Sequence, residues 1–433
     1  MALGQEKDQE PEQIGEEVDL DIQTQELLLA ASQHDLTKLQ ELLKTIPATV
    51  QDEETGYTPL HAAIAACVED EGNDDDHKVN GINGQSADAH GAENVELAEQ
   101  TLRLLFENGA IWNDLDANNE TPGCLARRLG LQSLYNMMVD AGVRAELLMN
   151  RLDGFMPLYD DEDEEEEEDE VEMEAVENIN GTNNVQEAPI IQLNGTAVSG
   201  DESTETQNYL HSDLTFQDDK LIDSSNNGVM MEWESNIMRQ SADLLLPEPG
   251  LSVLNIGHGM GIIDTLLQEK SPSHHHIIEA HPQVLAQMLD NGWRSSDEAT
   301  TTSTKHNNVT VHAGRWQDIL PQLVLAGTTF DAIYFDTFAE DYKAFRNFFE
   351  EFVIGLLKPQ GRWSFFNGLG ADRQVCYDVY TKVVEMDLFE AGFEVEWREV
   401  DTIEAEREGE WDGVRRRYWA LDKYRLPLCR FVS

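Results

Sequence analysis

The sequence predicts an α/β fold, a doubly wound and mostly parallel sheet, with an α-helical region before it. Two observations predict the sheet. Apolar strand-like runs alternate with helical segments after residue 209, and the uncharged run Ser252–Ile256 leads into three alternating glycines and a helical run. A third observation predicts the helical region: residues 25–43 contain two short amphipathic patterns joined by a polar turn.

The charge of the chain limits its partners. It has 433 residues, enough for two or three domains, and a formal net charge of −56. Contacts to a phosphate backbone need Lys and Arg, so this balance argues against direct nucleic-acid binding and favours basic protein partners. No apolar run approaches the ~20 residues of a membrane helix, and the acidic N-terminus resembles no targeting peptide, so no membrane partner is expected.

The cysteines and histidines suggest no metal site. The four cysteines are far apart in the chain, and no pair has the spacing of metal ligands: Cys67, Cys124, Cys376 and Cys429. Without a targeting peptide, they predict an intracellular protein with reduced thiols. The triplet His274-His275-His276 is interpreted as a polar loop before a strand.

The first 155 residues divide into a tail and a repeat-like region. Residues 1–22 are acidic and poor in apolar side chains, which predicts disorder. In residues 23–155, the run from Thr58 to Ala63 matches the Thr-Pro-Leu-His-x-Ala core of an ankyrin repeat, in which Thr and Pro begin a helix. A weaker copy begins at Thr121, and we interpret residues 68–94 as an inserted loop. The helices would form either a protein-binding surface or a solubilising cap.

An acidic segment separates this region from the predicted sheet. Between Asp160 and Glu174, thirteen of fifteen residues are Asp or Glu. Such a run repels itself and cannot pack, so residues 156–204 are predicted to be a disordered acidic linker. A spacer is favoured over a docking site for basic partners.

Residues 205–433 contain the alternating strands and helices. The expected strands are Ser252–Ile256, His276–Glu279, Asn308–His312, Phe330–Asp336 and Gly361–Phe366, followed by an antiparallel pair, Phe393–Trp397 and Arg416–Leu421. A strong helix is expected from Tyr342 to Leu357, ending before Pro359. Ligands of such sheets bind beyond the carboxyl ends of the strands.

The glycine turn predicts a nucleoside-containing cofactor. Gly257, Gly259 and Gly261 let the chain turn sharply and expose bare backbone, and the helix behind them offers free N–H groups. Glu279, at the end of the second strand, occupies the place of an acid that binds a ribose diol. Dinucleotide oxidoreductases and S-adenosylmethionine methyltransferases both fit these residues.

Three features favour a methyltransferase. The closing antiparallel pair is typical of that class, and no second pyrophosphate-type loop is evident. Asp336 ends an otherwise apolar strand, where a carboxylate suits a cationic substrate. Trp316 and Gln317 could stack on an adenine and contact its edge, although Trp316 also suits simple core packing.

Several ordered motifs resemble a known family. Residues 209–433 resemble guanidinoacetate methyltransferases through Val229-Met230-x-x-Trp233-Glu234, Val253–Met260, Ile277–Ala280, Gly314-x-Trp316-x-Asp318 and Phe335-Asp336-Thr337. With the ankyrin-like region, the acidic linker and Glu279-Ala280-His281, the whole chain is similar to the fungal type IV protein-arginine methyltransferases, which modify the internal δ nitrogen of the guanidino group.

This resemblance implies a Rossmann-like methyltransferase domain that uses S-adenosyl-L-methionine. Asp336 and Glu234 would hold the guanidinium and act in catalysis. The residues implied to contact the cofactor are Tyr209, Met230, Met238, Gly257, His258, Gly259, Met260, Gly261, Ile262, Glu279, Ala280, His281, Trp316, Gln317 and Asp336. Phe338 replaces a tyrosine of the guanidinoacetate enzymes, which puts one substrate contact in doubt.

The expected partners are proteins that bear arginine, basic ribosomal proteins among them. A monomer in the cytoplasm and nucleus is expected. Two alternatives stay open: methylation of a small guanidino compound, and a non-catalytic ankyrin adaptor.

Overall fold

The computed structural model describes residues 11–68, 87–152, 204–217, 219–294, 308–407 and 409–432. Most of the predicted inserted loop, and residues 156–203 of the predicted linker, lie outside these ranges. Residues 1–10 of the predicted tail lie outside them as well.

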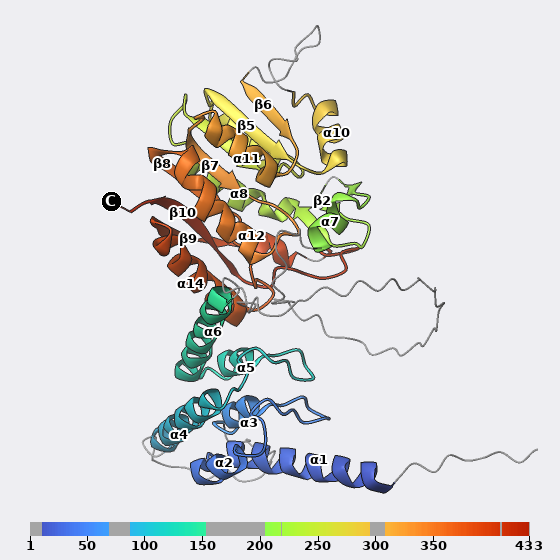
Figure 1. Ribbon diagram of the computed structural model, residues 1–433, viewed down its shortest axis with the longest axis vertical. Coiled ribbons are helices and arrows are strands. Elements are labelled where there is room, and N and C mark those ends of the chain that lie inside the picture. The colour runs from blue at the N-terminus through green and yellow to red at the C-terminus, as the bar shows by residue number, and fades with distance from the viewer. Residues whose placement is uncertain are drawn as a thin grey trace, which may run out of the picture. The chain divides into compact units, whose positions relative to one another are not determined.

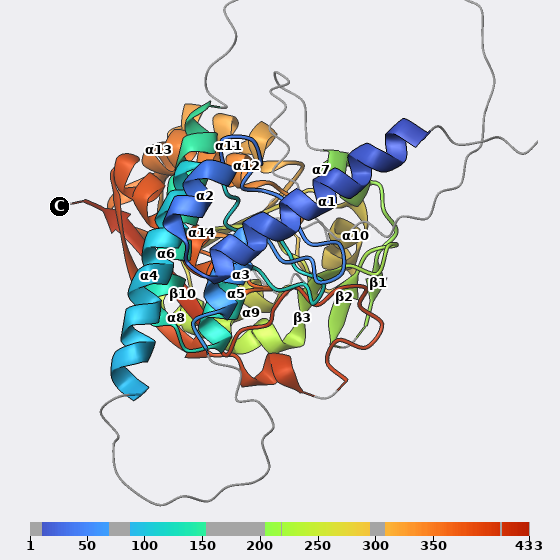
Figure 2. The same cartoon turned by 90° about the horizontal axis from the view of Figure 1, so that it is seen from below.

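The N-terminal region is built from helices (Figure 2). They are α1 (Pro11–Ser32), α2 (Leu36–Leu42), α3 (Pro59–Ala65), α4 (Ala87–Glu107), α5 (Pro122–Arg128) and α6 (Gln132–Leu152). As the motif predicts, the side chains of Thr58 and Thr121 accept backbone N–H groups at the starts of α3 and α5, each with proline in the first turn.

Two of these helices begin earlier than the sequence analysis predicts. Helix α1 begins at Pro11, inside the tail expected to be disordered, and α4 begins at Ala87, inside the expected loop. Taken over their whole lengths, α1 and α4 are rich in Glu, Ala, Gln and Leu, which favour helix, whereas the prediction relied on the low apolar content of their first residues.

The C-terminal region contains a seven-stranded sheet (Figure 1) with the order β6-β5-β4-β7-β8-β10-β9. The strands are β4 (Ser252–Ile256), β5 (His274–Glu279), β6 (Val309–Ala313), β7 (Phe330–Phe335), β8 (Leu357–Phe365), β9 (Phe393–Asp401) and β10 (Lys423–Phe431). Strands β4 to β8 pair in parallel, and β10 is antiparallel to both β8 and β9. The doubly wound sheet with a closing antiparallel pair is therefore confirmed.

Helices connect and cover these strands. They are α7 (Thr204–Leu210), η1 (Glu232–Glu234), α8 (Ser235–Leu245), α9 (Ile262–Glu269), α10 (Pro282–Asp290), α11 (Trp316–Leu325), α12 (Tyr342–Asn347), η3 (Phe348–Val353), α13 (Ile354–Leu356), α14 (Gln374–Glu390) and η4 (Ile403–Glu406). A second sheet of three short antiparallel strands precedes α8: β1 (Thr215–Phe216), β2 (Lys220–Ile222) and β3 (Gly228–Met231).

Two expectations about local structure are wrong, and a third is right only in part. The last strand is β10, not residues 416–421, which form a loop around the buried Trp419. The helix expected from Tyr342 to Leu357 is confirmed as far as Leu356, with a π-helical stretch inside it, but Pro359 lies within β8 and not in a break between elements. The triplet His274-His275-His276 begins β5 and is not a loop, because the side chain of His275 is fully buried.

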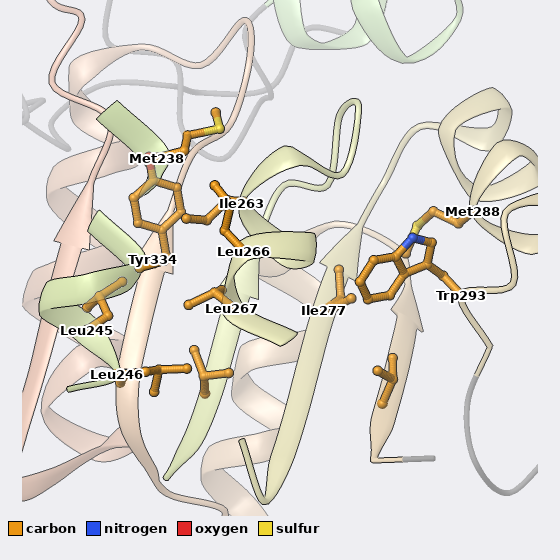
Figure 3. Close-up of a cluster of buried hydrophobic side chains, with 14 of the residues drawn as sticks. Met238, Leu245, Leu246, Ile263, Leu266, Leu267, Ile277, Met288, Trp293 and Tyr334 are labelled. Carbon is orange, nitrogen blue, oxygen red and sulfur yellow. The ribbon is translucent and has the colours of Figure 1, made fainter. Parts of the chain in front are cut away.

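A buried apolar cluster fixes the centre of the sheet (Figure 3). Tyr334 of β7 and Ile277 of β5 lie on either side of Ile263 and Leu267 from α9, and Met238 of α8 packs beside Tyr334. Burying apolar area stabilises a fold by roughly 25 cal/mol per Å². The cluster therefore fixes α9, and with it the turn that precedes α9.

Two further observations concern the described residues. No disulfide bond joins any of the four cysteines, which all lie in the described ranges. No helix in the described ranges is both long and apolar enough to cross a membrane.

Candidate active site

The ends of three neighbouring strands bring predicted site residues together. Ile256, the last residue of β4, pairs with Ile278 on one side and with Phe335 on the other. Gly257, Glu279 and Asp336 follow these three residues directly. All three therefore lie at the carboxyl edge of the sheet, where doubly wound folds bind ligands.

The glycine turn follows β4 and depends on residues without a side chain. Gly257, Gly259 and Gly261 have φ angles of 94°, 53° and 76°, in the left-handed region that favours glycine. A Cβ on Gly257 would lie 1.8 Å from the carbonyl oxygen of Asp336, and one on Gly259 would lie 2.7 Å from the methyl group of Met230. Ile262 then begins α9, whose first N–H groups face the turn.

Glu279 is held by backbone N–H groups. Its Oε2 accepts from the N–H of His258 at 2.8 Å, and its Oε1 accepts from the N–H of His281 at 2.7 Å. Ala280 lies between Glu279 and His281. Each carboxylate oxygen has a second lone pair, so Glu279 can still accept a hydroxyl group.

Residues from three segments surround this edge. The ring of Tyr209 packs against those of His281 and Phe338, with centroids 5.0 and 4.9 Å away. The N–H of Met260, in the glycine turn, donates to the sulfur of Met230 at 3.2 Å. These contacts place Met230 beside the turn and Tyr209 beside the segments that follow β5 and β7, and the closure of both over a cofactor stays a prediction.

Met238 lies deeper than the other predicted contacts. It is fully buried in the core cluster, on α8 beside Tyr334 (Figure 3). Its visible role is packing, and its contact with a cofactor also stays a prediction.

Trp316 and Gln317, at the start of α11, share a carboxylate. The indole N–H of Trp316 and the amide N–H of Gln317 donate to Glu340, at 2.8 and 2.9 Å from Oε1. Trp316 also packs edge-on against Phe335 and Phe348. The Oε1 atom of Gln317 is buried and accepts no hydrogen bond from the residues that the structure describes, so it could accept one from the amino group of an adenine.

The predicted catalytic pair lies where the small sheet meets the large one. Glu234 ends the short helix η1 after β3 and is only 4% exposed. Asp336 follows β7; it is partly exposed as a residue, but its Oδ2 is buried and has no hydrogen-bond partner within the described ranges. The hydroxyl of Tyr418 donates to Glu234. The structure therefore brings together two acids that are 102 positions apart in the chain.

Burial disfavours the charged form of both acids. Burial raises the pKa of Asp336 to about 7. Burial, and then the neighbouring charge of Asp336, raise the pKa of Glu234, while the hydrogen bond from Tyr418 opposes the rise. Among the described residues neither carboxylate has an ion-pair partner, so a cation supplied from outside would satisfy both.

A pocket opens beside Asp336, between the ends of β7 and β8. Its walls combine aromatic and polar side chains, and its lining is Phe335, Asp336, Thr337, Glu340, Asp341, Tyr342, Phe345, Phe365, Phe366, Asn367, Gly368 and Leu369. Three of these residues are acidic and none is basic. The pocket therefore suits an entering chain that carries positive charge.

Two residues of this site were missed by the sequence analysis. Tyr418 lies in the segment predicted to be a strand, and its contact with Glu234 spans 184 positions. Glu340 follows Asp336 by four residues in a polar stretch with no motif. No local pattern distinguishes either residue, since each acts through a distant partner.

Comparison with known proteins gives a family model and several relatives that cover much of the chain. A sequence model of the guanidinoacetate N-methyltransferase family matches residues 198–423. A protein of Emericella nidulans, named protein arginine N-methyltransferase 2, is 57% identical over 96% of this chain and 99% of its own. Proteins with the same name from Aspergillus fumigatus and Saccharomyces cerevisiae are 54% identical over 97% of this chain and 38% identical over 78% of it. They cover 98% and 79% of their own lengths.

One solved structure illustrates the level of structural likeness. An O-methyltransferase from Bacillus cereus in complex with SAH aligns with a TM-score of 0.33 and 14% identity, over 46% of this chain and 81% of that one. A likeness of this size carries no weight for function.

Proposed function

The chain belongs to the fungal protein arginine N-methyltransferase 2 family, and we propose that it transfers a methyl group from S-adenosyl-L-methionine to arginine in proteins. We further propose the internal δ nitrogen of the guanidino group as the acceptor, as in the type IV enzymes that the sequence resembles. The 57% identity over nearly the whole of both chains supports the proposed activity.

One observation carries this function. Glu234 and Asp336 approach each other at the sheet edge, and neither has an ion-pair partner among the described residues. Two such acids disfavour each other's ionisation and gain from a shared cation. The guanidinium of arginine is always charged and offers several N–H donors in one plane, so it fits a pair of carboxylates.

The residues at this edge also fit the proposed cofactor. The bare backbone at Gly257 and Gly259 offers a place for its methionine part. The carboxylate of Glu279 suits its ribose, and the buried Oε1 of Gln317 suits its adenine. When bound, S-adenosyl-L-methionine supplies a methyl group on a positively charged sulfur, and the sulfur keeps the electron pair of the broken C–S bond.

The two acids perform the rest of the chemistry. A guanidinium nitrogen is a poor nucleophile because its lone pair is delocalised. Glu234 and Asp336 would accept N–H groups and orient one nitrogen of the guanidinium for the transfer, which would lower the entropic part of the barrier. As the N–C bond forms, that nitrogen loses its proton to one of the acids, and Asp336, with its pKa near 7, suits this role.

A second candidate is methylation of a small guanidino compound. The match of residues 198–423 to the guanidinoacetate N-methyltransferase family favours it. Phe338 in place of the tyrosine of that family weighs against it, as does the acidic pocket beside Asp336, which would repel a carboxylate such as that of guanidinoacetate.

The N-terminal helices have a proposed role in substrate binding. We propose that residues 23–155 form an ankyrin-like domain and that residues 156–204 link it to the methyltransferase domain, residues 205–433. The helices capped by Thr58 and Thr121 support this proposal. The net charge of −56 supports basic substrates such as ribosomal proteins. A monomer that works in the cytoplasm and nucleus completes the proposal.

A competition between substrates tests the function. The protein is incubated with labelled S-adenosyl-L-methionine and either an Arg-rich ribosomal protein or guanidinoacetate. Label on the ribosomal protein alone is expected. Label on guanidinoacetate alone would favour the second candidate, and the absence of transfer, with no affinity for S-adenosylhomocysteine, would favour a non-catalytic adaptor.

A further inference from the structure

The first side chain of the glycine turn, that of His258, is fixed at two points. Its backbone N–H donates to Glu279, the acid expected to bind ribose. Its imidazole points back under the turn, where Nδ1 lies 2.6 Å from Oδ2 of Asp264 in α9. The ring also lies against Gly261, because a Cβ there would be 2.8 Å from Nε2. The shape of the turn therefore depends on where this ring is held.

Asp264 holds a second imidazole as well. Its Oδ1 lies 2.8 Å from Nε2 of His275 in β5, and Nδ1 of His275 lies 2.9 Å from the amide nitrogen of Gln268. An amide nitrogen donates, so Nδ1 of His275 accepts and its Nε2 carries the proton given to Asp264. Asp264 therefore accepts one N–H from each histidine with its two oxygens.

This carboxylate is kept charged without contact to solvent. Asp264 and His275 are fully buried, and His258 is 3% exposed. Burial alone would raise the pKa of Asp264, but the hydrogen bonds from the two histidines hold it at about 2. A buried ion is rarely the most stable way to fill a core, and apolar side chains of similar volume often do as well or better. The free energy that is needed to bury a charged carboxylate suggests that Asp264 has a role beyond packing.

The neighbouring aromatic ring closes the cluster. Trp293 meets the ring of His258 edge-on with centroids 5.4 Å apart, and it meets His275 in the same way at 6.2 Å. With Trp293 on one side and Asp264 on the other, the imidazole of His258 has little freedom to rotate. The position of its backbone N–H relative to Glu279 is restricted with it.

We propose that Asp264 is a positioning residue for the methyl donor, which acts through His258 to fix the glycine turn and to aim Glu279. The assignment rests on the proposed binding of S-adenosyl-L-methionine at this turn. Asp264 itself lies beneath the turn and contacts the donor only through His258. Its loss should weaken donor binding and leave the affinity for the arginine substrate unchanged.

The competing explanation is that Asp264 only ties α9 to β5 through His275. In that case its loss lowers the melting temperature of the protein without changing its affinity for the donor. The two explanations differ in a binding constant measured well below the melting temperature. They also differ in whether Asp264 and His258 act together.

The test uses the full chain and S-adenosylhomocysteine as the probe, titrated by calorimetry. The variants are Asp264→Asn, His258→Phe, which keeps a ring beside Trp293, and the double variant. A hydrogen bond to a buried carboxylate is worth about a tenfold change in affinity, so each single variant should bind about tenfold more weakly. Because both changes remove the same link, the double variant should lose little more than either single one.

Asp331→Asn is the matched control. Asp331 accepts hydrogen bonds from the N–H and the hydroxyl of Ser252, and it also pairs with Lys358. These contacts lie where β4 and β7 begin, at the end of the strands that is remote from the glycine turn. Its variant should lower the melting temperature and leave probe affinity unchanged.

Two results would overturn the proposal: unchanged probe affinity in Asp264→Asn, or losses that simply multiply in the double variant. If Asp264→Asn does not fold, His258→Phe decides alone, and unchanged affinity in that variant refutes the proposal. Failure of the unaltered protein to bind the probe would refute donor binding at this turn, so the two failures are distinguishable. The Michaelis constants provide a second readout, since only that for the donor should rise.

Discussion

A Cβ on Gly257 would lie 1.8 Å from the backbone carbonyl oxygen of Asp336. The backbone after β4 therefore touches the backbone after β7, and the N–H of Asp336 donates to Ile256 at 2.9 Å. The turn expected to hold the methyl donor and the acid expected to hold the arginine are parts of one backbone contact. Transfer needs both reactants at a fixed separation, and this contact sets it.

The substitution Gly257→Ala should destroy that contact. A left-handed backbone costs an ordinary residue roughly 1–2 kcal/mol, and the clash with Asp336 forces the two strand ends apart as well. We expect a lower melting temperature and at least about a tenfold loss of affinity for S-adenosylhomocysteine. Thermal unfolding and calorimetry measure the two effects.

Gly250→Ala is the control for backbone strain. Gly250 has a φ angle of 86°, but a Cβ there would meet nothing within 4 Å. It should lose stability and keep its affinity for the probe. Equal affinities in the two variants would show that the approach of Gly257 to Asp336 does not matter for donor binding.

Removing one hydroxyl should change the ionisation of the catalytic pair. Tyr418→Phe removes the hydrogen bond that opposes the rise in the pKa of Glu234. The pKa of Glu234 should therefore rise further, and the acid limb of the pH profile of kcat/KM should move to higher pH. Loss of a hydrogen bond to a charged group costs enough free energy to lower kcat/KM by about tenfold.

Tyr135→Phe provides the comparison. Tyr135 donates to the carboxylate of Asp378 at 2.5 Å, away from the catalytic pair. Its loss should lower the melting temperature and leave the acid limb in place. A limb that moves equally in both variants would contradict the role given to Tyr418.

Asp336 should make the free protein less stable as pH rises. Its pKa is about 7 in the folded protein and 3.8 ordinarily, so between these values the folded state binds more protons than the unfolded state. The free energy of unfolding should therefore fall from about pH 4 to pH 7, by roughly 1.4 kcal/mol for each unit of pKa difference. Denaturant unfolding of Asp336→Asn should show a smaller fall, and identical curves would contradict the assigned pKa.

The parts of this site that sequence reasoning predicts are those specified by local pattern. Gly257 to Gly261 require a left-handed backbone, and Glu279 and Asp336 each end an apolar strand, so their place at one sheet edge follows from the parallel topology. The protein-arginine assignment came from the order of several such motifs, and the comparisons confirm it.

The rest depends on contacts between distant segments. The last strand begins seven residues later than expected, at Lys423, and it contains Pro427, a residue that is ordinarily excluded from inner strands. Tyr418 and Trp419 look like strand residues because they are apolar, yet they line a loop against Glu234 and the core. The sequence predicts a loop at His275 because its hydrogen bond with the buried Asp264 becomes evident only in the fold.

The position of the methyl group should distinguish the proposed acceptor from its neighbours. Fragment mass spectrometry of a methylated ribosomal protein should show one methyl group on the internal δ nitrogen of an arginine. A methyl group on a terminal guanidino nitrogen would contradict that assignment while leaving arginine methylation intact.

The most direct test of the central claim is turnover by Asp336→Asn, measured with labelled donor and an Arg-rich protein alongside its affinity for S-adenosylhomocysteine. A positioned base contributes roughly a hundredfold or more to a rate, so turnover should fall by at least that factor while affinity for the probe stays unchanged. Full turnover in this variant would contradict the claim that Asp336 holds the guanidinium and receives its proton.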